Sequence, residues 1–234
     1  MAAATKVRQH GSLRQLAPNV WVVRGRGPIP VDRNMVVIRR DSGELILHSP
    51  VALDDAGLRA LSALGKPAVM IVPNIGHQSD APFYAARFPE MVFICPAGAK
   101  AGVEPNVRIA ATVEDMIPVF GWKAHKIPAY RVAEFVLEVP LDGGGRALLV
   151  NDLFAGPNSP RQSFTGFLIT PISTPGNRFG IPRIVRWRMI EDMAAIRRFA
   201  EGLATVPDLR LITVSHGDVV TAAPAEALRA AVAA

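Results

Sequence analysis

The sequence predicts a mixed fold of the α+β class. Short apolar runs rich in Val, Ile and Leu alternate with segments whose apolar residues recur every three to four positions. Half of the 234 residues are apolar but only 6% are aromatic, so the core must rest on aliphatic side chains. Such a core suits strands covered by Ala-rich helices. A chain of this length commonly folds as one unit, and we expect a single domain over residues 1–234.

The apolar runs predict strands because they are short and rich in β-branched residues. They are Val20–Val23, Met35–Ile38, Leu45–Leu47, Val69–Val72, Val92–Ile94, Phe135–Val139, Ala147–Val150 and Leu211–Val214. Glycine turns at 41–43 and 142–145 predict two antiparallel hairpins, since glycine admits positive φ. Helical spacing predicts helices at Asp54–Leu64, Pro82–Phe88, Met189–Leu203 and Pro224–Val232.

The positive charge is concentrated in one stretch of the chain. The formal net charge is +6, and Arg178–Arg198 holds six arginines against only Glu191 and Asp192. These arginines could bind an anionic substrate or a phosphate, or they could form a basic helix face over the core, which we favour. We find no nucleic-acid-binding motif, and so we expect no specific nucleic acid partner.

The lone cysteine and the N-terminal composition predict a cytoplasmic protein. Cys95 follows an apolar run and can form no internal disulfide, which favours a reducing compartment. The start of the chain shows no apolar signal region, and no apolar stretch is long enough for a membrane span. Residues 155–182 are rich in proline and glycine, so we expect a lid or an oligomer contact there, with a homo-oligomer as one outcome.

Polar residues follow several of the predicted strands. His48, His77, Asp152 and His216 all come within a few positions of an apolar run. Polar groups just beyond strands gather at one edge of a sheet, where sites form. His and Asp are the residue types of metal and acid–base chemistry.

The order of these segments resembles the metallo-β-lactamase superfamily, and the resemblance runs from about Leu16 to His216. Leu16–Val23 is similar to the first strand of that fold, and Asn34–Pro50 is similar to the hairpin that follows. His48 stands where the family carries a structural Asp. The resemblance implies a four-layer αββα sandwich, hydrolysis that depends on metal, and a small-molecule substrate or ligand, for which the net charge suggests an anion.

The metal-binding motif of the family, His-x-His-x-Asp-His, is only partly kept. Under the resemblance, Ile75 replaces the first His of this motif and His77 keeps the second. Ser79 replaces the Asp, and Asp80 replaces the last His. Further along the chain, Tyr130 replaces another ligating His, whereas Asp152 corresponds to the bridging Asp and His216 to the final His. Ile75 has no lone pair, and a neutral phenol is a poor metal ligand. We therefore expect one of the two family metal sites to be empty.

The other metal site keeps enough ligands for one ion. Asp80, Asp152 and His216 would hold it, with His77 as an auxiliary ligand, and the cofactor would be one divalent metal (zinc, iron or manganese) or none. His77 and Asp152 are the catalytic candidates. Tyr130, Ser79 and His48 are the candidates for substrate binding.

The same residues also have ordinary structural interpretations. Ser79 or Asp80 could cap the helix that begins near Pro82, and we favour capping at that position. Asp152 and His216 could simply close turns. Two functional hypotheses therefore stay open: a metal-dependent hydrolase with a reduced site, and a binding or scaffold protein that keeps the fold without metal. A binder of anionic or membrane surfaces through Trp187 and its neighbouring arginines is a weaker third.

Overall fold

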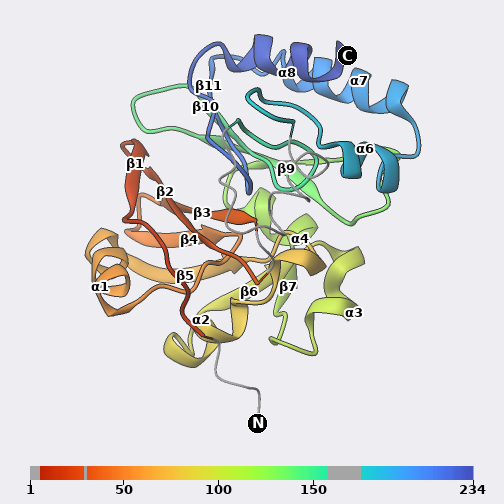
Figure 1. Ribbon diagram of the computed structural model, residues 1–234. Helices are drawn as coiled ribbons and strands as arrows, with labels where there is room; N and C mark the ends of the chain where they lie inside the picture. The colour runs from red at the N-terminus through yellow and green to blue at the C-terminus, as the bar shows by residue number, and fades with distance from the viewer. Residues whose placement is uncertain (1–5, 29–30, 158–174, 234) are drawn as a thin grey trace. The chain divides into compact units, whose positions relative to one another are not determined.

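The computed structural model describes residues 6–28, 31–157 and 175–233 (Figure 1). The chain divides into two compact units. The first unit comprises Met1–Ile29 and Arg33–Gly121, and the second comprises Pro30–Asp32 and Trp122–Ala234. Each unit combines one β-sheet with its own helices.

The first unit contains, within its described residues, a seven-stranded sheet in the order β1-β2-β3-β4-β5-β6-β7. The strands are β1 (Arg14–Ala17), β2 (Val20–Arg26), β3 (Asp32–Arg39), β4 (Glu44–His48), β5 (Lys66–Ile71), β6 (Val92–Cys95) and β7 (Ala111–Thr112). β3 and β4 form an antiparallel hairpin, whereas β4, β5, β6 and β7 run parallel. Gly43, with φ of 80°, makes the hairpin turn.

Helices connect the parallel strands of the first unit, and one more helix follows the last of these strands. They are α1 (Asp55–Leu64), α2 (Ala81–Arg87), α3 (Lys100–Val103) and α4 (Val113–Val119), with the 3₁₀ turns η1 (Ile75–His77) and η2 (Ala97–Ala99). The side chain of Asp54 accepts a hydrogen bond from Gly57 N and thereby caps α1. Thr112 caps α4 in the same way through Asp115 N.

The second unit contains a four-stranded sheet, within its described residues, in the order β11-β10-β9-β8. The strands are β8 (Lys123–Lys126), β9 (Phe135–Pro140), β10 (Arg146–Leu149) and β11 (Leu209–Thr213), and the helices are α6 (Arg183–Arg188), α7 (Met193–Leu203) and α8 (Pro224–Ala233). β9 and β10 form the second predicted hairpin, and β10 runs parallel to β11. α7 packs against α8, and α8 packs against β11 (Figure 1).

The predicted strands and hairpins are confirmed, with differences at the polar or short elements. β8 was not predicted because its sequence, Lys-Ala-His-Lys, lacks an apolar run. The helix predicted over Met189–Leu203 is wrong at its start, because α6 ends at Arg188 and α7 begins at Met193. Asp192 lies at the break, where its carboxylate accepts a hydrogen bond from Ala194 N and caps the new helix.

Much of the predicted lid, residues 158–174, lies outside the described residues. On its flanks, Ala155 and Gly180 form a β-bridge, so the described ends of the segment meet within the second unit. No helix in the described part of the chain is both long and apolar enough to cross a membrane.

The core of the second unit predicts a large cost for removing one ring. Phe154 is fully buried and stacks on Phe179, with 5.2 Å between ring centroids. Replacing Phe154 by Ala should lower the free energy of unfolding by about 3–5 kcal/mol, since it leaves a cavity. Val119→Ala, at a side chain 69% exposed, should change it by less than about 0.5 kcal/mol. Urea denaturation of both variants measures this, and equal effects would contradict the assignment of Phe154 to the core.

Candidate functional site

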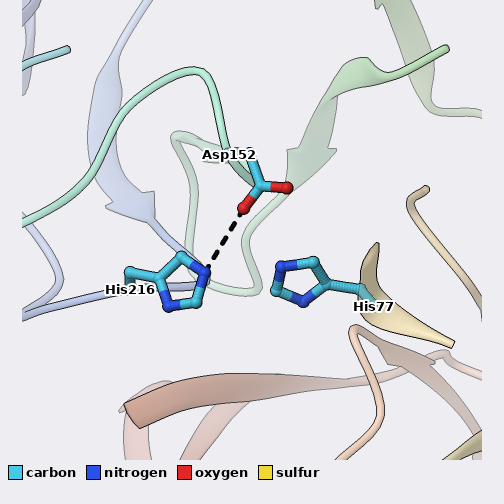
Figure 2. A group of neighbouring side chains, drawn as sticks. All are labelled: His77, Asp152 and His216. Atoms are coloured by element: carbon cyan, nitrogen blue, oxygen red, sulfur yellow. Dashed lines mark ion pairs between the residues drawn. The ribbon is translucent and has the colours of Figure 1, made fainter. Parts of the chain in front are cut away.

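Asp152 and His216 come together at the carboxyl ends of two neighbouring strands. β10 and β11 are parallel, and Leu149 pairs with Thr213 at their ends. The chain therefore leaves both strands at the same edge of the sheet. There, Nε2 of His216 lies 3.3 Å from Oδ1 of Asp152, as the dashed line in Figure 2 marks. Both side chains are partly exposed, at 17% and 19%.

The ring of His216 is oriented by a backbone carbonyl. Its Nδ1 lies 2.7 Å from the carbonyl oxygen of Asp32, which also belongs to the second unit. A carbonyl can only accept, so Nδ1 carries the proton and donates it to this bond. In the neutral ring the lone pair is then on Nε2, the nitrogen that faces Asp152.

The loop that carries His216 is held by close backbone contacts. Gly156 N donates to the carbonyl of His216 at 2.8 Å, and Asp218 N donates to the carbonyl of Pro157 at 2.8 Å. Gly217 has φ of 83°, and a Cβ atom there would lie 2.2 Å from the carbonyl oxygen of Gly156. Only glycine fits this position, so the packing of the two loops requires Gly217 between His216 and Asp218.

Asp152 is positioned by a carboxylate that the sequence analysis missed. Glu134 is 2% exposed, and its Oε1 accepts hydrogen bonds from Asp152 N at 3.0 Å and Leu153 N at 3.3 Å. Its Oε2 accepts from the side-chain amide of Asn151 at 3.3 Å. Asn151 in turn accepts from Ser215 Oγ, next to His216. The sequence feature that could have identified Glu134 is its position as an acidic residue directly before the apolar strand β9.

Tyr130 lies beside this pair as a neutral phenol. Burial raises the pKa of its hydroxyl far above the usual value, and the carboxylates of Glu134 and Asp152 raise it further. The hydroxyl donates to Sδ of Met189 at 3.4 Å. A phenol with a raised pKa does not become a phenolate at ordinary pH. Its role in substrate binding stays a prediction.

In the first unit, His77 and His48 lie at the carboxyl end of the parallel pair β4–β5. His48 ends β4 opposite Ile71, and His77 follows β5 in η1. His77 is 4% exposed, and its Nδ1 lies 2.9 Å from Oγ of Ser49. Ser49 is fully buried and has φ of 62°, an unusual backbone conformation for a serine. The strand end thus holds the imidazole of His77, drawn in Figure 2, through a buried hydroxyl.

Asp80 is engaged inside the first unit. Its carboxylate is buried, forms an ion pair with the guanidinium of Arg33 and accepts a hydrogen bond from Ala52 N at 2.9 Å. Arg8 lies 3.5 Å from its other oxygen, Oδ1. Asp80 does occupy the N-cap position of α2, but its side chain makes no capping bond there, so the favoured capping role is wrong for it. These contacts give the carboxylate a structural partner in place of a metal.

Ser79 and Ile75 also differ from the metal ligands that the family has at these positions. Ser79 Oγ accepts a hydrogen bond from Nη1 of the buried Arg33 at 3.0 Å. Ile75 is 57% exposed and contributes no polar atom. Of the candidates in the first unit, His77 therefore keeps the chemistry of a metal ligand, whereas Ser79 and Asp80 bind Arg33.

Solved structures of metallo-β-lactamases are similar to this chain over nearly its whole length. The DIM-1 metallo-β-lactamase is 10% identical, with a TM-score of 0.60 and coverage of 96% of this chain and 98% of that one. FIM-1 from Pseudomonas aeruginosa, in its mono-zinc form, is 13% identical, with a TM-score of 0.59 and coverage of 98% and 97%. The enzyme from Hirschia baltica is 14% identical, with a TM-score of 0.59 and coverage of 94% and 97%.

The likeness at these identities concerns the fold. No protein-family model matches the chain, and no curated protein matches it. The chain has the metallo-β-lactamase fold, so the α+β fold predicted from its sequence is confirmed.

The contacts of Glu134 predict that it stabilises the loop of Asp152. In Glu134→Gln, one carboxylate oxygen becomes an amide donor that meets either backbone N–H groups or the amide of Asn151. We expect the free energy of unfolding to fall by about 1–3 kcal/mol. Glu191→Gln is the matched control, because Glu191 is 55% exposed in its pair with Arg131. This change should lower the free energy of unfolding by less than about 1 kcal/mol. Chemical denaturation compares the two, and an effect no larger than that of the control would refute the role.

The buried imidazole of His48 predicts a loss of stability in acid. Burial, and next the nearby His77, lowers the pKa of His48 to about 3, from an ordinary value of 6.5. The unfolded chain therefore takes up this proton at higher pH than the folded chain does. This contribution to stability is complete above pH 6.5 and is lost as the pH falls toward 3, by up to about 1.4 kcal/mol per pH unit.

Denaturation of the native protein and of His48→Asn across this pH range tests that interpretation. The variant should lose the His48 component, so its stability should fall less steeply with decreasing pH. Identical slopes for the two proteins would contradict the neutral, buried state of His48.

Proposed function

We propose that the protein is a metal-dependent hydrolase that holds one divalent ion with Asp152 and His216. The observation that carries this proposal is the Asp152–His216 pair, in which a backbone carbonyl directs Nε2 toward the carboxylate. The metallo-β-lactamase fold supports the reaction class by analogy.

The donor set fits a divalent ion. An imidazole and a carboxylate are ligands that zinc, iron and manganese accept, and His216 and Asp152 offer one of each within the second unit. Metal-binding histidines commonly donate their other ring N–H to a carbonyl or carboxylate, as Nδ1 of His216 does to Asp32. The proposed set leaves out Asp80, because Arg33 and Ala52 already occupy its carboxylate.

One ion is more consistent with the residues than a pair. Ile75 and Tyr130 provide no imidazole where the family motif has one, and Ser79 provides no carboxylate. Two cations close together need several anionic and imidazole ligands to offset their repulsion. FIM-1 has been solved in a mono-zinc form, so a protein of this fold can hold a single ion.

The chain's own residues supply specific roles in hydrolysis. A bound divalent ion would polarise a carbonyl or phosphoryl oxygen and lower the pKa of water. Asp152 is the proposed acceptor for the proton of the attacking water. Tyr130, which stays neutral, is the proposed hydrogen-bond donor to an oxygen of the substrate. The net charge of +6 favours a small anionic substrate.

A second candidate function is metal-free binding. The direct contact of 3.3 Å between Asp152 and His216 lets a carboxylate and an imidazolium satisfy each other without an ion. The pairing of Asp80 with Arg33 likewise fills a ligand position of the family with a structural ion pair. Under this alternative the fold would bind a small ligand and catalyse nothing.

Metal analysis of purified protein separates the two candidates. After reconstitution with zinc, manganese or iron and removal of excess metal, we expect one ion per chain by elemental analysis. Asp152→Ala and His216→Ala should lose this ion, because each removes a ligand, together with hydrolysis of ester, lactone or phosphodiester substrates. Tyr130→Phe is the control, and it should keep the ion because the phenol is not a ligand.

Two results would count against the hydrolase. Protein without stoichiometric metal under all three conditions favours the metal-free binding function. Two ions per chain, or loss of the ion in Tyr130→Phe, would overturn the ligand set.

A further inference from the structure

The short helix α6, labelled in Figure 1, carries an unusual combination of exposed side chains. Arg183, Arg186 and Arg188 are exposed, and Trp187 between them is 76% exposed. The other two tryptophans, Trp21 and Trp122, are each 7% exposed. An indole ring among guanidinium groups combines an apolar side chain with positive charge, and both properties suit binding to an anionic interface.

The sequence around α6 is rich in arginine and contains few acidic residues. The sequence between Asp152 and Glu191 contains no Asp or Glu but contains Arg161, Arg178, Arg183, Arg186 and Arg188. Within the part of the chain that the structure describes, Arg178, Arg183 and Arg188 form no ion pair. The nearest acidic residues are engaged, since Glu191 pairs with Arg131 at 3.3 Å and Asp192 caps α7.

The exposed face is held rigidly from below. Val185 is 4% exposed and belongs to the core of the second unit, against which Ile184, Met189 and Ile190 pack. Arg131 N donates to the carbonyl of Met189, and Glu191 N donates to the carbonyl of Ala129, both at 2.9 Å. A face anchored in this way pays little ordering entropy on binding.

We propose that α6 docks the protein on an anionic membrane surface. Trp187 would enter the headgroup region, where the indole ring is favoured, and Arg183, Arg186 and Arg188 would bind lipid phosphates. One apolar side chain or a few charges alone hold a protein weakly, but together they supply the two signals that stable peripheral binding needs. A single-stranded nucleic acid is disfavoured, because it needs several aromatic platforms and α6 exposes one.

Co-sedimentation with vesicles tests the proposal. The full chain should bind phosphatidylcholine vesicles that contain phosphatidylserine, should not bind pure phosphatidylcholine, and should be released by high salt. Each arginine near the surface contributes about a fivefold gain in affinity, so Arg183→Gln/Arg188→Gln should weaken binding by about 25-fold. The matched control is Arg59→Gln/Arg108→Gln, which removes the same charge from exposed positions of the first unit and should bind as the native chain does.

Tryptophan emission gives a second readout. Trp187 is the only strongly exposed tryptophan, so binding to anionic vesicles should shift the emission to shorter wavelength, and Trp187→Ala should abolish the shift. Equal binding to both vesicle types, binding that ignores salt, or an equal loss in the Arg59/Arg108 control would overturn the proposal. Binding to a single-stranded oligonucleotide but not to vesicles would overturn the assignment to lipid. Vesicle binding does not require metal, so it stands or fails separately from hydrolysis.

Discussion

The parallel pairing of β10 with β11 is the constraint on which the candidate site depends. Asp152 and His216 are far apart in the sequence, and neither has a short-range reason to meet the other. Because Leu149 pairs with Thr213, both chains leave the sheet at one edge, and the side chains that follow are brought within 3.3 Å. The loops after these strands must then lie almost backbone to backbone, which explains the glycines at Gly156 and Gly217.

Two buried carboxylates, those of Glu134 and Asp80, have different roles in the structure. Glu134 receives backbone and amide donors and so gives the Asp152 loop one fixed shape. Asp80 pairs with Arg33 and Arg8 and accepts a hydrogen bond from Ala52 N, at a position where the family resemblance places a metal ligand. A buried carboxylate must find partners, because its desolvation is costly.

The proposed ligands depend on shielding and fixed orientation, whereas the basic surface of α6 depends on exposure and charge. His216 and Asp152 are partly shielded, and their contact relies on fixed orientation. The arginines of α6 are exposed, and their positive charges add up because this stretch of the sequence contains no acidic residues. Met189 joins the two regions of the second unit, since its carbonyl binds Arg131 N and its sulfur accepts from Tyr130.

The sequence by itself determined most of the strands, the two hairpins and the residues worth examining. Apolar β-branched runs and glycine turns are local signals, and they predicted β9, β10 and the hairpin between them correctly. The positions of His77, Asp152 and His216 after such runs were readable for the same reason. The break between α6 and α7 was not, because helical spacing continues through Asp192 and only its capping bond ends the pattern.

Only the tertiary structure decided what each polar residue binds. Nothing near Asp80 in the sequence indicates Arg33, and nothing near Asp152 indicates Glu134, because these partners come from distant positions in the chain. The tautomer of His216 likewise depends on a carbonyl at Asp32, far away in the chain. Hydrogen bonds act over about 3 Å in space regardless of sequence separation, so a motif can list candidate ligands but cannot say which of them is already occupied.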